Sequence, residues 1–107
     1  MSEVTLTVTP GDKSTGSGFT GLFGVLSHKA QPGETNLTIN GLPAGTRYIS
    51  VWVTECTEGD SDVSMAGGAL FFTSSVQLYE NGTKCRVRFS QNWHIPLKAA
   101  VQGIYGS

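Results

Sequence analysis

The chain has 107 residues, enough for one domain with a single modest core, and we expect residues 1–107 to form that domain. Its formal net charge of −1 gives no bulk attraction to nucleic acid or to an anionic membrane surface, so neither is expected as a partner. Only 14% of the residues are charged and 14 are glycines, a composition typical of short strands joined by glycine-rich turns.

The sequence contains no apolar run of membrane-spanning length. Its first residues, Met1-Ser2-Glu3-Val4, show neither a basic segment nor an apolar one after it, so no classical signal peptide is expected. Membrane insertion is not expected, and the cellular location stays open. Cys56 and Cys85 are the only cysteines and lack metal-site spacing, so two buried thiols are expected, although pairing stays open.

Apolar and polar side chains alternate along most of the N-terminal half, which is typical of strands with one buried face. We expect four strands there, separated by turns rich in glycine and proline. Glycines interrupt the second strand, which indicates a bulge or a close approach of another backbone. The four strands are expected at residues 4–8, 19–26, 36–40 and 48–54. In the last of them Ile49, Val51 and Val53 share one face, and Tyr48, Ser50 and Trp52 share the other.

The C-terminal half is expected to contain an acidic loop at residues 55–62, a short edge strand at 63–65, a hairpin and a terminal strand. Residues 69–73 lead into the hairpin and either continue it or bend at Thr73. Residues 97–105 have helix propensity, but we expect a strand because the last of them, Ile104-Tyr105, favour β structure. The whole pattern predicts an all-β, single-domain jelly roll or β-sandwich of about eight short antiparallel strands.

The strongest structural signal is a hairpin over residues 74–89. Asn81-Gly82 tolerates the positive φ angles that a type I′ turn needs at both central residues. The turn fixes the register, so Ser75 is expected opposite Arg88. One face of the hairpin is then apolar and the other is polar and basic. The apolar face holds Val76, Leu78, Cys85 and Val87, and the polar face holds Ser75, Gln77, Tyr79, Lys84, Arg86 and Arg88.

Three motifs with possible chemistry do not fit their surroundings. Residues 16–21 match G-x-G-x-x-G, but a dinucleotide site needs a following helix and a parallel sheet. His28 and His94 are the only histidines and no nucleophile elbow is present, so no enzyme is expected. Asp60 and Asp62 would give Ca²⁺ two oxygen ligands of the about six to eight that it takes, so we prefer a solvated acidic loop. No cofactor or metal is expected, although calcium binding stays open.

Aromatic rings and arginines are the remaining candidates for a binding site. Aromatic faces stack on the C–H patches of sugars, and Arg and His donate hydrogen bonds to sugar hydroxyls. Arg86, Arg88, Trp93 and His94 lie close together in the sequence. The alternative interpretation is that Trp52 and Trp93 belong to the core and that the arginines are ordinary surface residues.

Two local resemblances to known families bear on function. The run Gly41-Leu42-Pro43-Ala44-Gly45-Thr46-Arg47-Tyr48 looks like the tyrosine corner of fibronectin type III domains, which implies a structural or adhesive interaction module. The C-terminal half resembles the end of trimeric, tumour-necrosis-factor-like bacterial lectin domains that bind fucosylated glycans. That second likeness lies in Val87-Arg88-Phe89-Ser90, His94-Ile95, Ala99 and Ile104-Tyr105-Gly106.

The lectin resemblance implies a trimer with sugar bound between neighbouring protomers. It implies that Arg88 bonds the sugar hydroxyls and that Tyr48 and Ser75 contribute from the adjoining chain. We therefore expect a non-catalytic carbohydrate-binding protein, a lectin, that forms a homo-oligomer with a trimer favoured. The alternative is a fibronectin-like or immunoglobulin-like module without glycan affinity. The candidate ligand-binding residues are Arg88, Arg86, Tyr48, Ser75, Trp93 and His94.

Overall fold

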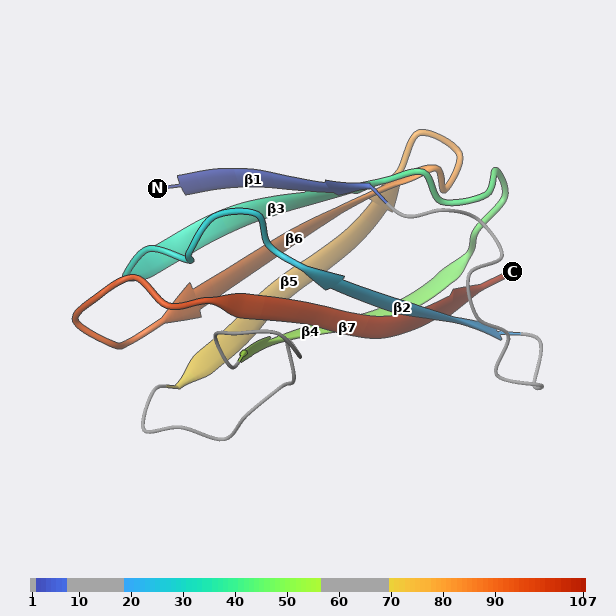
Figure 1. Ribbon diagram of the computed structural model, residues 1–107. Coiled ribbons are helices and arrows are strands. Elements are labelled where there is room, and N and C mark those ends of the chain that lie inside the picture. The colour runs from blue at the N-terminus through green and yellow to red at the C-terminus, as the bar shows by residue number, and fades with distance from the viewer. Residues whose placement is uncertain (1, 8–18, 57–69) are drawn as a thin grey trace.

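The computed structural model describes residues 2–7, 19–56 and 70–107, which form seven strands and no helix (Figure 1). The strands belong to two sheets that enclose one hydrophobic core. The all-β class and the sandwich architecture predicted from the sequence are therefore confirmed. The short strand expected at residues 63–65 and most of the acidic loop at 55–62 lie outside the described residues.

The four-stranded sheet has the order β1-β3-β6-β5. β6 (Lys84–Gln91) pairs antiparallel with both β3 (Gly33–Asn40) and β5 (Phe71–Tyr79). β1 (Ser2–Thr7) pairs in parallel with β3, which departs from the antiparallel arrangement expected from the sequence. A parallel pair needs a long crossover, and here the chain between β1 and β3 supplies one because it passes through the other sheet.

The three-stranded sheet has the order β2-β7-β4 and is antiparallel throughout. It consists of β2 (Phe19–Val25), β7 (Ala99–Gly106) and β4 (Tyr48–Glu55). β7 is a strand despite its helix propensity, as expected. β7 hydrogen-bonds to a strand on each side, and its Val101 and Tyr105 are buried in the core. These interactions outweigh the helix propensity of its residues, because propensities of ordinary residues differ by only a few tenths of a kcal/mol, about 0.7 at most.

The sequence predicts local irregularities in β2 and near Thr73, and the structure bears out the second. A Cβ added at Gly24 would lie 2.6 Å from the Leu6 side chain, so this glycine in β2 allows the close approach of β1. The pairing of β2 with β7 has no register shift, so there is no bulge, and the group that approaches Gly24 is the Leu6 side chain and not the backbone that was expected. The bend expected at Thr73 is a register shift between Thr73 and Ser75 in β5. β6 continues to Gln91, two residues beyond the hairpin expected at residues 74–89.

In β3 and β6 every second residue fills the core, whereas β5 departs from the apolar face predicted for the hairpin, because Leu78 is half-buried but Val76 is 37% exposed. In β6 the buried side chains of Cys85, Val87 and Phe89 alternate with the exposed side chains of Arg86 and Arg88. This is the alternation that the hairpin predicts. The largest fully buried side chains are Phe89, Leu37, Ile39, Val87, Val101, Thr35 and Cys85.

The hairpin turn between β5 and β6 is left-handed, as its sequence predicts. Asn81 and Gly82 have φ angles of 55° and 77°, and the φ angle of Glu80 is also positive, at 50°. The Thr83 N–H donates to the Glu80 carbonyl at 3.1 Å, which closes the turn. The predicted register holds, because Tyr79 faces Lys84 and each pair from there to Ser75 and Arg88 is as expected.

The tip of this hairpin packs against the turn between β3 and β4. The Gly45 N–H donates to the Asn81 carbonyl at 2.8 Å, and the Leu42 N–H donates to the Thr83 carbonyl at 3.2 Å. Gly82 is buried in this contact, where an added Cβ would collide with the Thr46 carbonyl oxygen. The two turns therefore hold each other, and the hairpin is fixed at its tip as well as along its strands.

Replacing Gly82 by alanine should destabilise the protein strongly, because the new Cβ meets backbone and the residue keeps a positive φ. We expect a loss of about 2–4 kcal/mol in the free energy of unfolding, measured by urea denaturation. Gly45→Ala is the matched control: its φ is also positive, at 84°, but nothing lies within 4 Å of the added Cβ. That variant should lose only about 1 kcal/mol. Equal losses would contradict the docked turn.

Candidate functional site

The outer side of the four-stranded sheet carries a polar face. Two rows of side chains cross its strands there, set by the strand pairing. Each row contains one arginine of β6 between a β3 residue and a β5 residue. We call this surface the polar face, and it consists of Glu3, Asn36, Arg88 and Ser75 in one row and Thr5, Thr38, Arg86 and Gln77 in the other.

Arg88 is held at the centre of its row by its neighbours. Its Nε donates to Oδ1 of Asn36 at 3.5 Å. The hydroxyl of Ser74, the extra residue at the β5 irregularity, donates to the Arg88 backbone carbonyl at 3.1 Å. A guanidinium has five N–H donors, and among the described residues the Asn36 oxygen is the one side-chain acceptor that engages them, which leaves donors for a further acceptor.

Arg86 is oriented by an aromatic ring. Its guanidinium carbon lies 4.9 Å from the ring centroid of Tyr79, a cation–π contact worth about 0.5–1 kcal/mol at an exposed site. Stacking leaves the N–H edge of the guanidinium available to hydrogen-bond acceptors. Lys84, the next outward residue of β6, is instead paired with Glu80 at 3.3 Å. Arg86 and Arg88 are therefore the cations of this face that are available to a ligand.

The structure brings together three of the six residues predicted for the site. Arg86, Arg88 and Ser75 share the polar face of one chain. Tyr48 begins β4 on the outer side of the other sheet, 54% exposed, with the Arg47 guanidinium 5.8 Å from its ring centroid. One chain alone therefore does not place Tyr48 beside the arginines.

The last two predicted residues, Trp93 and His94, lie in the loop after β6, with their ring centroids 5.1 Å apart. The alternative that the tryptophans belong to the core is wrong, because Trp93 and Trp52 are 37% and 45% exposed. Buried Gln91 shapes this loop: its Nε2 donates to the carbonyls of Ala30 and Ile95, both at 3.1 Å, and its Oε1 accepts from the Trp93 N–H at 2.6 Å.

Sequence reasoning did not find Asn36 and Gln91. Asn36 was assigned to a strand, but its position beside Arg88 depends on the pairing of β3 with β6, which joins residues far apart in the chain. Nothing in the sequence around Gln91 indicates that its side chain is buried and holds the loop after β6. For Asn36, the one indication in the sequence is its position on the outward face of a predicted strand.

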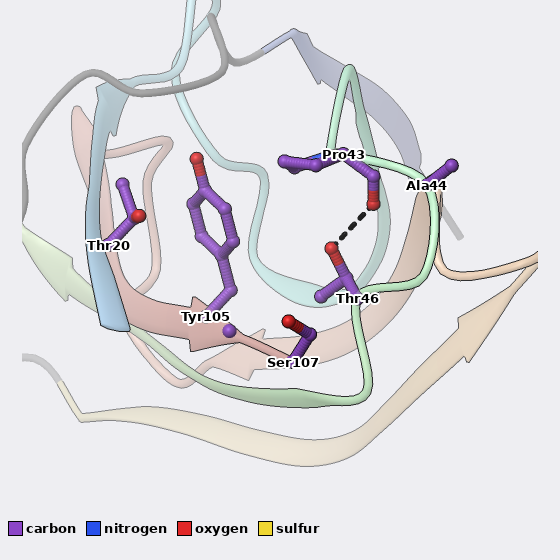
Figure 2. Close-up of a pocket in the computed structure, with 7 residues that line it drawn as sticks. Thr20, Pro43, Ala44, Thr46, Tyr105 and Ser107 are labelled. Carbon is purple, nitrogen blue, oxygen red and sulfur yellow. Dashed lines mark hydrogen bonds between the residues drawn. The ribbon is translucent and has the colours of Figure 1, made fainter. Parts of the chain in front are cut away.

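A pocket of about 150 Å³ opens at the end of the sandwich where the chain terminates (Figure 2). The Tyr105 ring points into it between Thr20 and Pro43 (Figure 2). The Thr46 hydroxyl donates to the Pro43 carbonyl at 2.6 Å, but the buried Tyr105 hydroxyl has no hydrogen-bond partner among the described residues. None of the predicted site residues lines this pocket, which is formed by Thr20, Pro43, Ala44, Thr46, Tyr105, Gly106 and Ser107.

Tyr105→Phe should leave the protein as stable as the wild type or more stable by about 1 kcal/mol, because it removes a buried hydroxyl that makes no hydrogen bond to any described residue. Thr46→Val is the matched control: it breaks a hydrogen bond at the same pocket and should cost about 1 kcal/mol. Thermal and urea unfolding measure both. A loss above about 1 kcal/mol for Tyr105→Phe would contradict the unpartnered hydroxyl.

The described residues contain no cluster of three or more histidine, cysteine or acidic side chains that could hold a metal ion. Asp60 and Asp62, named for a calcium site, lie outside the described residues. A search of the described part of the chain for an apolar helix of membrane-crossing length also finds none.

Both cysteines are buried and neither forms a disulfide, which confirms the expectation of two buried thiols. Burial raises the pKa of the Cys85 thiol above its ordinary value of 9.0, and a backbone hydrogen bond involving Gln77 lowers it by less. A buried thiol with a raised pKa carries little of the reactive thiolate at neutral pH. Cys85 is therefore a packing residue and not a candidate nucleophile.

The raised pKa of Cys85 predicts a loss of stability at alkaline pH. Above about pH 9 the unfolded chain releases the thiol proton while the folded chain keeps it, so rising pH favours unfolding until the higher folded-state pKa is reached. Urea denaturation of the wild type and of Cys85→Ala at pH 7.5 and pH 10 measures this. The variant should lose less stability between the two pH values, and an equal loss in both proteins would contradict the buried thiol.

Comparison with known proteins adds no relative to this description. No family model, no curated protein and no solved structure matches the chain. The resemblances to lectin and fibronectin domains therefore stay predictions, and function is inferred from the polar face.

Proposed function

We propose that the protein is a non-catalytic lectin that binds glycan hydroxyls on the polar face, with Arg88 at the centre. The observation that carries the proposal is the row in which Asn36 holds the Arg88 guanidinium while Ser75 lies on its other side. Arg86 lies two residues away in the next row, between Thr38 of β3 and Gln77 of β5. The two arginines are therefore about 7 Å apart along the strand. That separation suits hydroxyl groups on opposite sides of one sugar ring or on adjacent rings.

The mixture of groups favours a neutral, hydroxyl-rich ligand over an anionic one. A sugar hydroxyl both donates and accepts, so it needs donors and acceptors close together, and the polar face offers guanidinium, amide, hydroxyl and carboxylate groups. A phosphate-binding surface would concentrate positive charge. Here Glu3 stands in the same row as Arg88, and the chain as a whole carries a net charge of −1.

The lectin proposal includes a homo-oligomer, with a trimer favoured and a fucosylated glycan as ligand. Tyr48 is exposed but lies on the other sheet, so its ring would serve the site of a neighbouring copy. Trp93 and His94 follow β6 directly and would extend the contact beyond the end of the strand. Several weak sites in one assembly would gain affinity by avidity.

Glycan-array binding by the wild type and by Arg88→Ala tests the proposal. The wild type should bind a defined set of glycans, and Arg88→Ala should bind them at least about tenfold more weakly, because hydrogen bonds to a charged group are worth about 1.5–3 kcal/mol. Lys29→Ala is the control, since it removes an exposed cation between β2 and β3 and should bind like the wild type.

An array without hits for the wild type, or unchanged binding by Arg88→Ala, would reject the lectin proposal. In that case the alternative, a fibronectin-like or immunoglobulin-like interaction module without glycan affinity, becomes the better interpretation. That alternative also predicts a monomer or a tandem unit and no homo-oligomer in solution.

A further inference from the structure

The tip of the β5–β6 hairpin carries Asn81 followed by Gly82, the pair of residues at which an asparagine side chain most readily loses its amide. In this deamidation the Gly82 backbone nitrogen gives its proton to water or hydroxide and attacks Cγ of Asn81. The bond between Cγ and the side-chain nitrogen breaks, ammonia leaves, and a cyclic succinimide remains. Water then opens one of its two carbonyls and gives aspartate or iso-aspartate, with no change in oxidation state.

The folded turn directs the attacking nitrogen away from the group that it would attack. The Gly82 N–H donates to the Tyr79 carbonyl at 3.1 Å. When the proton is lost, the lone pair of the nitrogen takes the direction of the former N–H bond, toward the Tyr79 oxygen and not toward Cγ of Asn81. Attack therefore requires this hydrogen bond to open and the peptide unit to rotate, a local opening of the kind that exposes backbone amides to hydrogen exchange.

Docking of the hairpin tip opposes that rotation. A peptide unit is planar, so the N–H of Gly82 turns together with the carbonyl of Asn81. That carbonyl accepts from the Gly45 N–H at 2.8 Å. Gly82 is also buried so closely against the Thr46 backbone that an added Cβ would collide with it. Both ends of the peptide unit are thus hydrogen-bonded, one within the hairpin and the other to the turn between β3 and β4.

The two products of deamidation differ in whether they fit the docked tip. Aspartate leaves the backbone unchanged and tolerates the left-handed conformation. Iso-aspartate carries the main chain through Cβ, which adds one atom to the backbone of the turn. The tip is docked on its other side by the Leu42 N–H, which donates to the Thr83 carbonyl at 3.2 Å. The extra atom lies between this hydrogen bond and the one from Gly45, so the two cannot both keep their geometry.

We propose that Asn81 is a deamidation site that the docking of the two turns keeps inactive, so that the amide is lost only from molecules whose hairpin tip has opened. Iso-aspartate then prevents the tip from docking again, and each such molecule stays modified. The reaction takes place at the hairpin tip and does not depend on glycan binding.

Peptide mapping by mass spectrometry, after incubation at mildly alkaline pH, measures the rate of deamidation at Asn81. The folded wild type should deamidate at least about tenfold more slowly than the same protein in urea, because only the opened fraction reacts. Gly45→Ala strains the turn that donates to the Asn81 carbonyl, and this variant should react about fivefold faster than the folded wild type.

Gly33→Ala is the matched control for Gly45→Ala. The φ angles of these two glycines are 91° and 84°, and an added Cβ would have no neighbour within 4 Å at either position. Gly33 begins β3 opposite Gln91, at the end of the strand away from the hairpin tip. The control is therefore strained to a similar extent but should deamidate at the wild-type rate. Circular dichroism verifies that each variant is folded.

A folded wild type that deamidates as fast as the chain in urea overturns the proposal, and this comparison decides even if Gly45→Ala does not fold. Equal rates for Gly45→Ala and Gly33→Ala also overturn it, because the reaction would then not depend on the docked turn. The iso-aspartyl form, isolated by chromatography, should unfold at a lower urea concentration than Asn81→Asp, which has the other product at this position. Equal stability of the two would contradict the fixed tip.

Discussion

The alternation of side chains along β6 is the constraint on which the rest of the structure depends. Cys85, Val87 and Phe89 have no exposed surface, and the two arginines between them can therefore only point outward. A shift of the register by one residue would bury both guanidinium groups, at a cost that no core of this size can offset. The docked left-handed turn at residues 80–83 prevents that shift, because its backbone hydrogen bonds tie it to the turn between β3 and β4.

Local patterns in the sequence predict the strands and their faces, but not which strands become neighbours. Asn81-Gly82 fixes a pairing of residues that are close in the chain, so the register down to Ser75 and Arg88 follows from the turn alone. The position of Asn36 beside Arg88, and the parallel pairing of β1, join segments far apart in the chain, and periodicity carries no information about such pairs. The candidate site is therefore predicted in its β5–β6 half and not in its β3 half.

The aromatic residues show the same limit. Alternation in β4 correctly puts Tyr48 and Trp52 on one face, but it does not say whether that face is buried. The answer depends on the other sheet, which packs against the side of Val51 and Val53 and leaves Trp52 in water. The two outer surfaces of the sandwich consequently differ: one carries the charged and hydroxyl groups of the polar face beside the exposed Phe72, and the other exposes Phe23, Trp52 and Ile104.

The central claim is that the polar face is the surface where ligand binds, and a two-dimensional ¹H–¹⁵N NMR titration with L-fucose tests it most directly. Free sugar binds a single site weakly, so the titration is followed at millimolar concentrations, where fast exchange reports the contact residue by residue. The account predicts progressive shifts at the amides of Asn36, Ser75, Arg86 and Arg88 and none around the Tyr105 pocket. Shifts confined to that pocket or to Phe23 and Trp52, or a spectrum unchanged by glycans of every class, would contradict it.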